Sequence, residues 1–268
     1  MRSLRIGFWL GVLVLAVLVV AAIVPGALAP HSPDAADPLL TLARPSARFL
    51  FGTDQNGRDV FSRVVFGVRR SLLTGVGASA LALLGGTVLG VLATQGGRLA
   101  DEVVTRLLDV QMAIPGMTLA LLVIAVTGTG TGSVVVAVAV ITIPGYARIV
   151  RGQILQIRRS GYVEAAVALG QRPSTITIRH VVPNALGPVL VLATIGVGAA
   201  IGAGSSLSFL GLGGQGGAPE WGAMLAGSRD YFAVAWWAAV FPGLAITITV
   251  LAVTVVGRHL QKRIEGRQ

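Results

Sequence analysis

The sequence predicts an all-α membrane protein with six transmembrane helices. Of its 268 residues, 54% are apolar and only 12% are charged, whereas a soluble domain carries about 25% charged residues. The 36 glycines lie largely inside apolar runs, which is typical of closely packed membrane helices. The absence of cysteine excludes disulfides, thiolate metal sites and thiol catalysis. The net charge of +10 fits arginines that mark cytoplasmic loops better than a nucleic-acid surface, so no nucleic-acid partner is expected.

Each predicted span is an apolar run of about 20 residues, the length that a helix needs to cross a hydrocarbon core of ~30 Å. The stretch from Val110 to Ala147 carries no charge over 38 residues, which at 1.5 Å per residue is about 57 Å and too long for one crossing. Alternating glycines at 127–133 divide it. Trp236 and Trp237 begin the last span, where an interfacial aromatic belt is expected. The six spans are 7–29, 71–95, 107–126, 133–150, 185–210 and 233–257.

The basic residues predict that both termini are cytoplasmic. Of the 21 Lys and Arg, 14 fall on the side of the N-terminus and 7 on the other side. The first span has a cleavable signal peptide as its alternative, but the apolar run from Ile6 to Val24 exceeds the usual ~7–15 residues, so an uncleaved helix is expected. N-terminal sequencing distinguishes the two. The expected organisation is an N-terminal helix at 1–29, an extracytoplasmic segment at 30–70, a five-helix core at 71–258 and a cytoplasmic tail at 259–268.

The extracytoplasmic segment divides into two parts. Residues 30–57 are rich in proline, aspartate and alanine, which predicts an extended chain. Residues 58–70 predict a short amphipathic helix at the membrane interface, leading into the second span. The alternative is an extension of that span with no role beyond anchoring. The apolar stripe consists of Val60, Phe61, Val64, Val65 and Val68.

The cytoplasmic loop at 151–183 is 33 residues long, whereas bundle helices are usually joined by about 2–8 residues. Ser160 can cap a helix that runs from Tyr162 to Leu169, and Gly170 stands where a helix end needs a positive φ. Ser174 can cap a second short helix, which Pro183 is expected to stop. The loop therefore predicts two short helices joined by a tight turn.

This helical loop offers a contact surface for another protein. Ala165, Ala166 and Gly170 have almost no side chain, so another surface can approach their backbone, and Glu164 adds one charged contact. The alternative is a solvated loop whose arginines only follow the positive-inside rule. That alternative accounts for the arginines but not for the Glu-Ala-Ala helix with its glycine stop.

Three motifs in this chain resemble those of membrane subunits of ATP-binding-cassette importers. Glu164-Ala-Ala166, Gly170 and Pro183 fit the spacing of the EAA signature, with His180 and Val182 in place of its Ile and Leu. The histidine form is similar to that of the peptide-transport branch. The other two stretches similar to that branch are 51–63, leading to Gly67 and Ser71, and 207–213, followed by 219–222 and Met224-Leu225. Over nearly its whole length, the chain resembles the C-type permease of dipeptide, oligopeptide and nickel importers.

That resemblance implies a type I importer permease fold in a bacterial inner membrane and the uptake of short peptides. It implies a second permease as heterodimer partner, two ATPase subunits and an extracytoplasmic binding protein. The chain has no phosphate-binding glycine loop, so it is expected not to be an enzyme and to bind no cofactor, with ATP and Mg on the partners. The ATPase-coupling residues implied are Tyr162, Glu164, Ala165, Ala166, Leu169, Gly170, Arg172, Pro173, His180 and Pro183.

A translocation path is expected near Asp109, Gln111 and Pro115. Asp109 is the only acidic residue near a span, and intramembrane acids often handle ions or substrate. Its alternative is an interfacial position. Pro115 and Pro144 are expected to kink the third and fourth spans, as hinges or as packing features. The histidines at 31, 180 and 259 lie in separate segments, which argues against a metal site.

Other functions remain open from the sequence. A permease for nickel or another small solute shares the same motifs. An ion-coupled secondary transporter usually has more buried ionisable residues and an inverted repeat. A membrane scaffold or channel subunit is a third possibility. Co-purification with a P-loop ATPase separates the importer from the last two.

Overall fold

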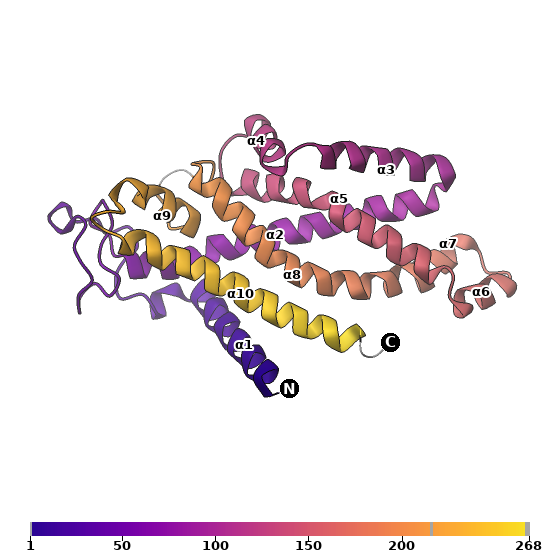
Figure 1. The fold of residues 1–268 in the computed structure, drawn as a ribbon, viewed down its shortest axis with the longest axis horizontal. Coiled ribbons are helices and arrows are strands. Elements are labelled where there is room, and N and C mark those ends of the chain that lie inside the picture. The colour runs from indigo at the N-terminus through magenta and orange to yellow at the C-terminus, as the bar shows by residue number, and fades with distance from the viewer. Residues whose placement is uncertain (1, 215–216, 266–268) are drawn as a thin grey trace.

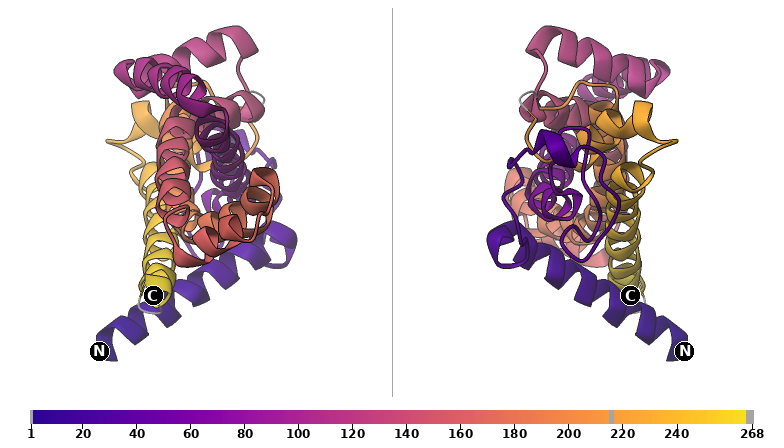
Figure 2. Two further views of the ribbon diagram at one scale, coloured as in Figure 1. Left: turned by 90° about the vertical axis from the view of Figure 1, so that its right-hand side faces the viewer. Right: turned by 90° about the vertical axis from the view of Figure 1, so that its left-hand side faces the viewer.

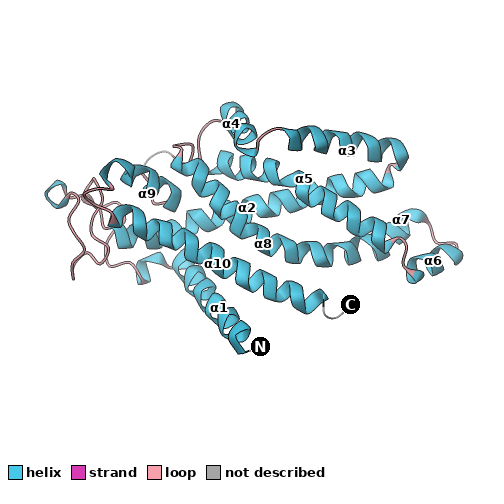
Figure 3. Ribbon diagram, in the orientation of Figure 1, coloured by secondary structure: helices cyan, strands magenta, loops and turns pink. Residues whose placement is uncertain are grey.

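The computed structural model describes residues 2–214 and 217–265, and in this part of the chain the regular elements are helices. They form an elongated bundle (Figure 1, Figure 3). The longer helices are α1 (Arg2–Ile23), α2 (Val60–Gln95), α3 (Gly97–Ala113), α4 (Gly116–Thr127), α5 (Thr131–Ile157), α8 (Val182–Phe209) and α10 (Trp237–Glu265). The shorter elements are η1 (Pro25–Ala27), η2 (Pro38–Leu40), α6 (Gly161–Ala168), α7 (Pro173–Ile176), the π turn η3 (Thr177–Val181), α9 (Trp221–Ser228) and η4 (Arg229–Tyr231).

Hydropathy located five of the six predicted spans. Five helical segments are long and apolar enough to cross a membrane: Ile6–Ile23, Val60–Gln95, Thr131–Ile157, Pro173–Phe209 and Trp237–Lys262. The break predicted at 127–133 is confirmed, because α4 ends at Thr127 and α5 begins at Thr131. The expected start of the last helix at the tryptophans is also confirmed.

The prediction of one helix over 107–126 is wrong. α3 and α4 pass the same test only as a pair, and they meet at 98°. The break falls at Ile114 and Pro115, whose backbones are extended. A proline disfavours helical geometry in the residue before it, which ends α3 at Ala113. Six crossings therefore require that this bent pair be counted as one.

Small residues let the central helices approach closely. α2 packs against both α5 and α8. A Cβ placed on Gly86 would lie 2.5 Å from the Tyr146 Cβ, and one on Gly90 would lie 2.8 Å from the Val150 side chain. Helices that face lipid gain no hydrophobic energy from one another, so close backbone contact of this kind stabilises their association. The buried Gly, Ala and Ser residues of α2 are Ser62, Gly67, Ser71, Gly75, Ala78, Ser79, Ala82, Gly86, Gly90 and Ala93.

The amphipathic segment at 58–70 continues into the second span without a break. Asp59 is the N-cap of α2, and its carboxylate accepts hydrogen bonds from the backbone N–H groups of Phe61 and Ser62. From this cap the helix runs on to Gln95. The expected amphipathic helix is therefore the first part of α2 and not a separate element. This agrees with the alternative, in which residues 58–70 extend the second span. Residues 30–57, which were predicted to be extended, form an irregular chain with turns, bends and the short η2.

The bundle has two distinct ends. The end that carries α6 and α7 lies opposite the end that carries α9 and the irregular segment at 30–57 (Figure 1). The N-terminal end of α1 and the C-terminal end of α10 lie near each other in all views (Figure 2). The Phe8 and His259 rings join these two helices with centroids 4.3 Å apart.

Candidate functional site

The loop between α5 and α8 forms the predicted pair of short helices. α6 ends in a Schellman motif, because the Gly170 N–H donates to the Val167 carbonyl and the Gln171 N–H donates to the Ala166 carbonyl. Gly170 has a φ of +73°, and a Cβ there would meet nothing within 4 Å. The backbone conformation, rather than lack of space, therefore accounts for this glycine.

Two of the predicted helix caps differ in detail. Ser160 occupies the N-cap position of α6, but its hydroxyl donates to the Ile157 carbonyl at 2.5 Å and makes no capping bond. At α7 the N-cap is Arg172, with Pro173 in the first turn, so the prediction that Ser174 is the cap is wrong. Proline is favoured at this position because its missing N–H has no partner in a first turn.

Pro183 begins a helix rather than stopping one. The chain turns from α7 through the π turn η3 into α8, and Pro183 lies in the first turn of α8. The wider π turn just before Pro183 relieves the contact between its ring and the preceding carbonyls. The predicted stop at Pro183 is therefore wrong, and residues 173–209 form one continuous helical stretch.

α6 has a buried face and an exposed face. Val163 and Ala166 are 4% and 5% exposed and belong to the same apolar cluster as Ile154 of α5 and Val189 of α8. The expectation that Ala166 faces another protein is therefore wrong, because its methyl group packs inward. The exposed face carries Tyr162, Glu164, Ala165, Val167 and Leu169.

The other predicted coupling residues differ from one another in how far they are exposed. Arg172, Pro173 and Pro183 are exposed, and Leu169 is 80% exposed. His180 is half-buried, and its backbone carbonyl accepts a hydrogen bond from the Asn184 amide at 2.6 Å. The structure thus places Tyr162, Glu164 and Ala165 on α6 and Leu169 at its C-cap, while His180 and Pro183 lie beyond α7.

Sequence reasoning missed the residues that tie this loop to α2. The Gln95 amide donates to the Thr177 hydroxyl at 2.6 Å. The Arg158 guanidinium donates to the Thr94 carbonyl at 2.8 Å. Gln95 and Thr177 lie 82 positions apart in the sequence, and no local pattern relates them. The only available signal was Gln95 itself, a polar residue at the end of an apolar run.

The predicted path residues lie on α3 and at its break, and they pair with α5. The Asp109 carboxylate accepts a hydrogen bond from Arg148 at 2.5 Å, and both side chains are nearly half exposed. The Gln111 amide donates to the Val140 carbonyl at 2.5 Å. Pro115 forms the break itself. A second ion pair, between Asp101 and Arg151, joins the same two helices through two hydrogen bonds of 2.6 Å.

Pro144 lies inside α5 without ending it. Prolines also lie inside α8 and α10, at Pro188 and Pro242, which the sequence reading did not single out. Within the described residues, no group of three or more His, Asp or Glu side chains is placed to hold a metal ion.

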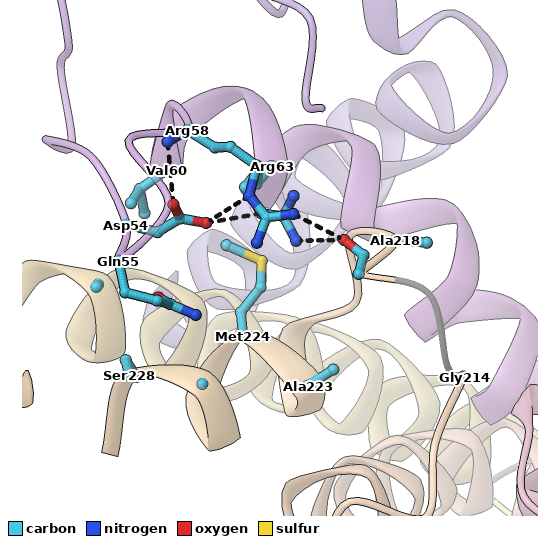
Figure 4. A pocket seen from close by; sticks show the side chains of 13 residues that line it. Asp54, Gln55, Arg58, Val60, Arg63, Gly214, Ala218, Ala223, Met224 and Ser228 are labelled. Carbon is cyan, nitrogen blue, oxygen red and sulfur yellow. Dashed lines mark hydrogen bonds and ion pairs between the residues drawn. The ribbon is translucent and has the colours of Figure 1, made fainter. Parts of the chain in front are cut away.

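At the opposite end, an ionic cluster holds the segment before α2 against the loop before α9 (Figure 4). Arg63 is 4% exposed and donates to the Gly217 carbonyl at 2.7 Å, and Arg58 donates to the same carbonyl at 3.4 Å. The Asp54 carboxylate lies 3.0 Å from the Arg58 guanidinium and 3.5 Å from that of Arg63. These groups line a cavity of about 180 Å³, which Met224 of α9 also lines.

Two residues at the start of α9 also fix this helix to its neighbours. The Trp221 indole N–H donates to the Val64 carbonyl at 2.9 Å, and its ring is fully buried. Glu220 is 3% exposed and accepts a hydrogen bond from the Ser208 hydroxyl at 2.5 Å. Both residues belong to the motif at 219–222, so the sequence singled out this region without indicating what it contacts.

Comparison with known proteins gives consistent matches. The model of a family described as binding-protein-dependent transport system inner membrane component matches residues 86–268. The dipeptide transport system permease protein DppC of Alkalihalophilus pseudofirmus is 36% identical over 96% of this chain and 84% of its own length. The glutathione transport system permease protein GsiD of Pectobacterium atrosepticum is 41% identical over 83% of this chain and 74% of its own length.

Solved structures agree with the fold. A chain of the MetNI methionine ABC transporter in an inward-facing conformation matches with a TM-score of 0.60 and 22% identity, over 75% of this chain and 95% of its own. A chain of an amino acid ABC transporter matches with a TM-score of 0.59 and 16% identity, over 75% of this chain and 94% of its own. At these identities the likeness concerns the fold, which is that of a type I importer permease.

Proposed function

This chain belongs to the family of inner membrane components of binding-protein-dependent transport systems, and from that membership we propose that it is the permease subunit of an ATP-driven importer of short peptides. It is a multi-pass inner membrane protein. The observation that carries the peptide assignment is the 36% identity to a dipeptide permease over 96% of the chain. Relatives named for di/tripeptide and D,D-dipeptide transport, at 36% and 37% identity, support the same substrate class.

The proposed complex contains a second permease, two ATPase subunits and an extracytoplasmic binding protein. On this proposal, the chain is not an enzyme and binds no cofactor, since ATP and Mg are held by the ATPase subunits. Both termini are cytoplasmic, so α6 and α7 face the cytoplasm. The ionic cluster of Asp54, Arg58 and Arg63 faces outward. The proximity of the ends of α1 and α10 supports this common side.

The proposed mechanism uses α6 as a handle for the ATPase. Its exposed face offers Glu164 and the Leu169 side chain to a partner. Its buried face, Val163 and Ala166, shares an apolar cluster with α5 and α8. A displacement of α6 by the ATPase therefore acts directly on the helices that cross the membrane, because packed interiors move as rigid bodies rather than deform.

Reconstitution of the complete complex tests the proposal. Proteoliposomes that contain ATP should accumulate a labelled dipeptide when the loaded binding protein is outside, and accumulation should stop without ATP. Uptake that continues without ATP and collapses with an ionophore would indicate an ion-coupled transporter. Uptake of Ni²⁺ but of no peptide would move the chain to the nickel importers. Failure of any P-loop ATPase to co-purify with the solubilised chain would refute the importer itself.

A further inference from the structure

A polar cavity of about 510 Å³ lies at the α6 end of the bundle. α8 packs against both α5 and α10, and the cavity is lined by all three helices and by α6. Its volume falls in the range of ~300–1,000 Å³ that small-molecule sites occupy. The polar side chains that line it are Gln153, Gln156, Ser160, Tyr162, Asn184 and Gln261.

Several of these polar groups have no hydrogen-bond partner in the described part of the chain. Among the described residues, the amides of Gln153 and Gln156 and the hydroxyl of Tyr162 make no hydrogen bond. Asn184 uses one amide hydrogen on the His180 carbonyl, which leaves its side-chain oxygen open. Amides on neighbouring turns of one helix are thus free to bind a ligand that both donates and accepts hydrogen bonds.

The other wall of the cavity is apolar. Ile157 of α5 and Pro188, Val191 and Leu192 of α8 line it, and none of the described side chains in the lining is charged. A ligand that fits both walls has uncharged amide groups along one edge and apolar groups along the other. This combination offers an inorganic ion no charged partner among the described residues and matches the backbone and side chains of a short peptide. Neutral amides bind a peptide backbone whatever its side chains, because every residue presents the same N–H and C=O groups.

We propose that this cavity binds a short peptide on the cytoplasmic side, after the peptide has crossed the membrane. The inference rests on the proposed function and adds a site within this chain. Tyr162 belongs to α6, so a peptide in the cavity contacts the handle together with α5 and α8. A ligand that bridges these elements favours the arrangement in which they are found here and opposes their movement. A peptide that accumulates in the cytoplasm therefore slows ATP hydrolysis, because it stabilises an arrangement that the transport cycle must leave.

Photolabelling of the complete complex locates the site. The probe is the dipeptide L-alanyl-L-photoleucine, added without binding protein, and adducts are mapped by mass spectrometry. Labelling is expected at 153–162 and 184–192 of this chain. The double variant Gln153→Leu/Gln156→Leu has side chains of similar volume but lacks both amides. At a subsaturating probe concentration its labelling should be about tenfold lower than that of the wild type, because two neutral hydrogen bonds are lost. Leu155→Met, on the same turn but outside the lining, is the matched control and should label like the wild type.

A second measurement keeps the test independent of folding. With the ATPase subunits outside the vesicles, added alanyl-leucine should lower the ATPase rate of the wild type and of Leu155→Met, and lower that of the double variant much less. Tyr162→Phe removes only a hydroxyl and should weaken the same inhibition.

The outcomes separate the two proposals. Normal ATP-dependent uptake with no adduct in the cavity overturns the cavity and leaves the importer intact. Labelling of the cavity by a photoreactive phosphatidylethanolamine, undiminished by excess alanyl-leucine, overturns it in favour of a lipid. Absence of uptake for every peptide refutes the importer function, whatever the labelling shows.

Discussion

Substituting Gly86 by alanine tests whether backbone contact holds α2 against α5. The added methyl carbon would lie 2.5 Å from the Tyr146 Cβ and 2.9 Å from the Ala147 nitrogen. Carbon atoms in contact are ~3.5–4.0 Å apart, so the helices must separate by about 1 Å. No side-chain rotation relieves a contact with backbone. Overpacking of this kind costs about 1–3 kcal/mol.

The matched control is Gly145→Ala, on α5 near the same crossing, where an added Cβ meets nothing within 4 Å. Both variants gain the same helix propensity, about 1 kcal/mol, so their difference isolates the contact. At ~2–4 °C per kcal/mol for a chain of this size, Gly86→Ala should melt roughly 2–12 °C below the control. Size-exclusion chromatography of the heated, detergent-solubilised protein gives the midpoints. Equal midpoints for the two variants would falsify the close-contact account of this crossing.

Three further substitutions probe the handle. Glu164→Lys should leave the complex assembled but weaken ATPase docking and abolish uptake; uptake at the wild-type level removes Glu164 from the mechanism. Val163→Ala deletes two buried methyl groups, which stabilise the packing of α6 by about 2 kcal/mol. The number of ATP molecules hydrolysed per imported peptide should therefore rise. An unchanged ratio would show that other contacts hold α6 in place. Gly170→Ala forces a positive φ on alanine at a cost of about 1–2 kcal/mol, so the backbone amides of α6 should exchange hydrogen faster. The increase should be smaller in Gly170→Asn. Unaltered exchange would contradict the role of the Schellman turn.

Hydropathy and local turn chemistry predicted much of this molecule because both act over short distances. A run of about 20 apolar residues is stable in a hydrocarbon core only as a helix that satisfies its own backbone. The turn after α6 was equally predictable, since Gly170 has a conformation that other residues adopt at a cost. These elements need no knowledge of their neighbours.

Some of the failures are local, and others concern tertiary context. Proline was read as a kink at Pro115 and as a stop at Pro183, yet it produces a 98° break at the first and begins a helix at the second. The same residue type gives both results because the neighbouring turns decide whether its ring can be accommodated. Which alanine of the Glu-Ala-Ala motif points inward depends on where α5 and α8 lie. The bond between Gln95 and Thr177 depends on two helix ends meeting.

These tertiary contacts explain how a short loop helix can act on the whole bundle. α6 is joined to α5 and α8 by a shared apolar cluster, and α2 is joined to the same loop by the Gln95 amide. α2 in turn lies in backbone contact with α5 along its glycines. Val163 and Ala166 of α6 belong to one apolar cluster with Ile154 of α5 and Val189 of α8, so a rotation of α6 against these helices would have to open that packing, which costs more than moving them as a unit. The α3–α4 pair is bent at Pro115; α3 is joined to α5 by two partly exposed ion pairs, whereas α4 packs Ala120 and Ile124 into a buried cluster with α5. On the proposed mechanism, movement of α6 is therefore transmitted to α5 and α8 through their shared cluster, and to α2 through its close contacts with α5.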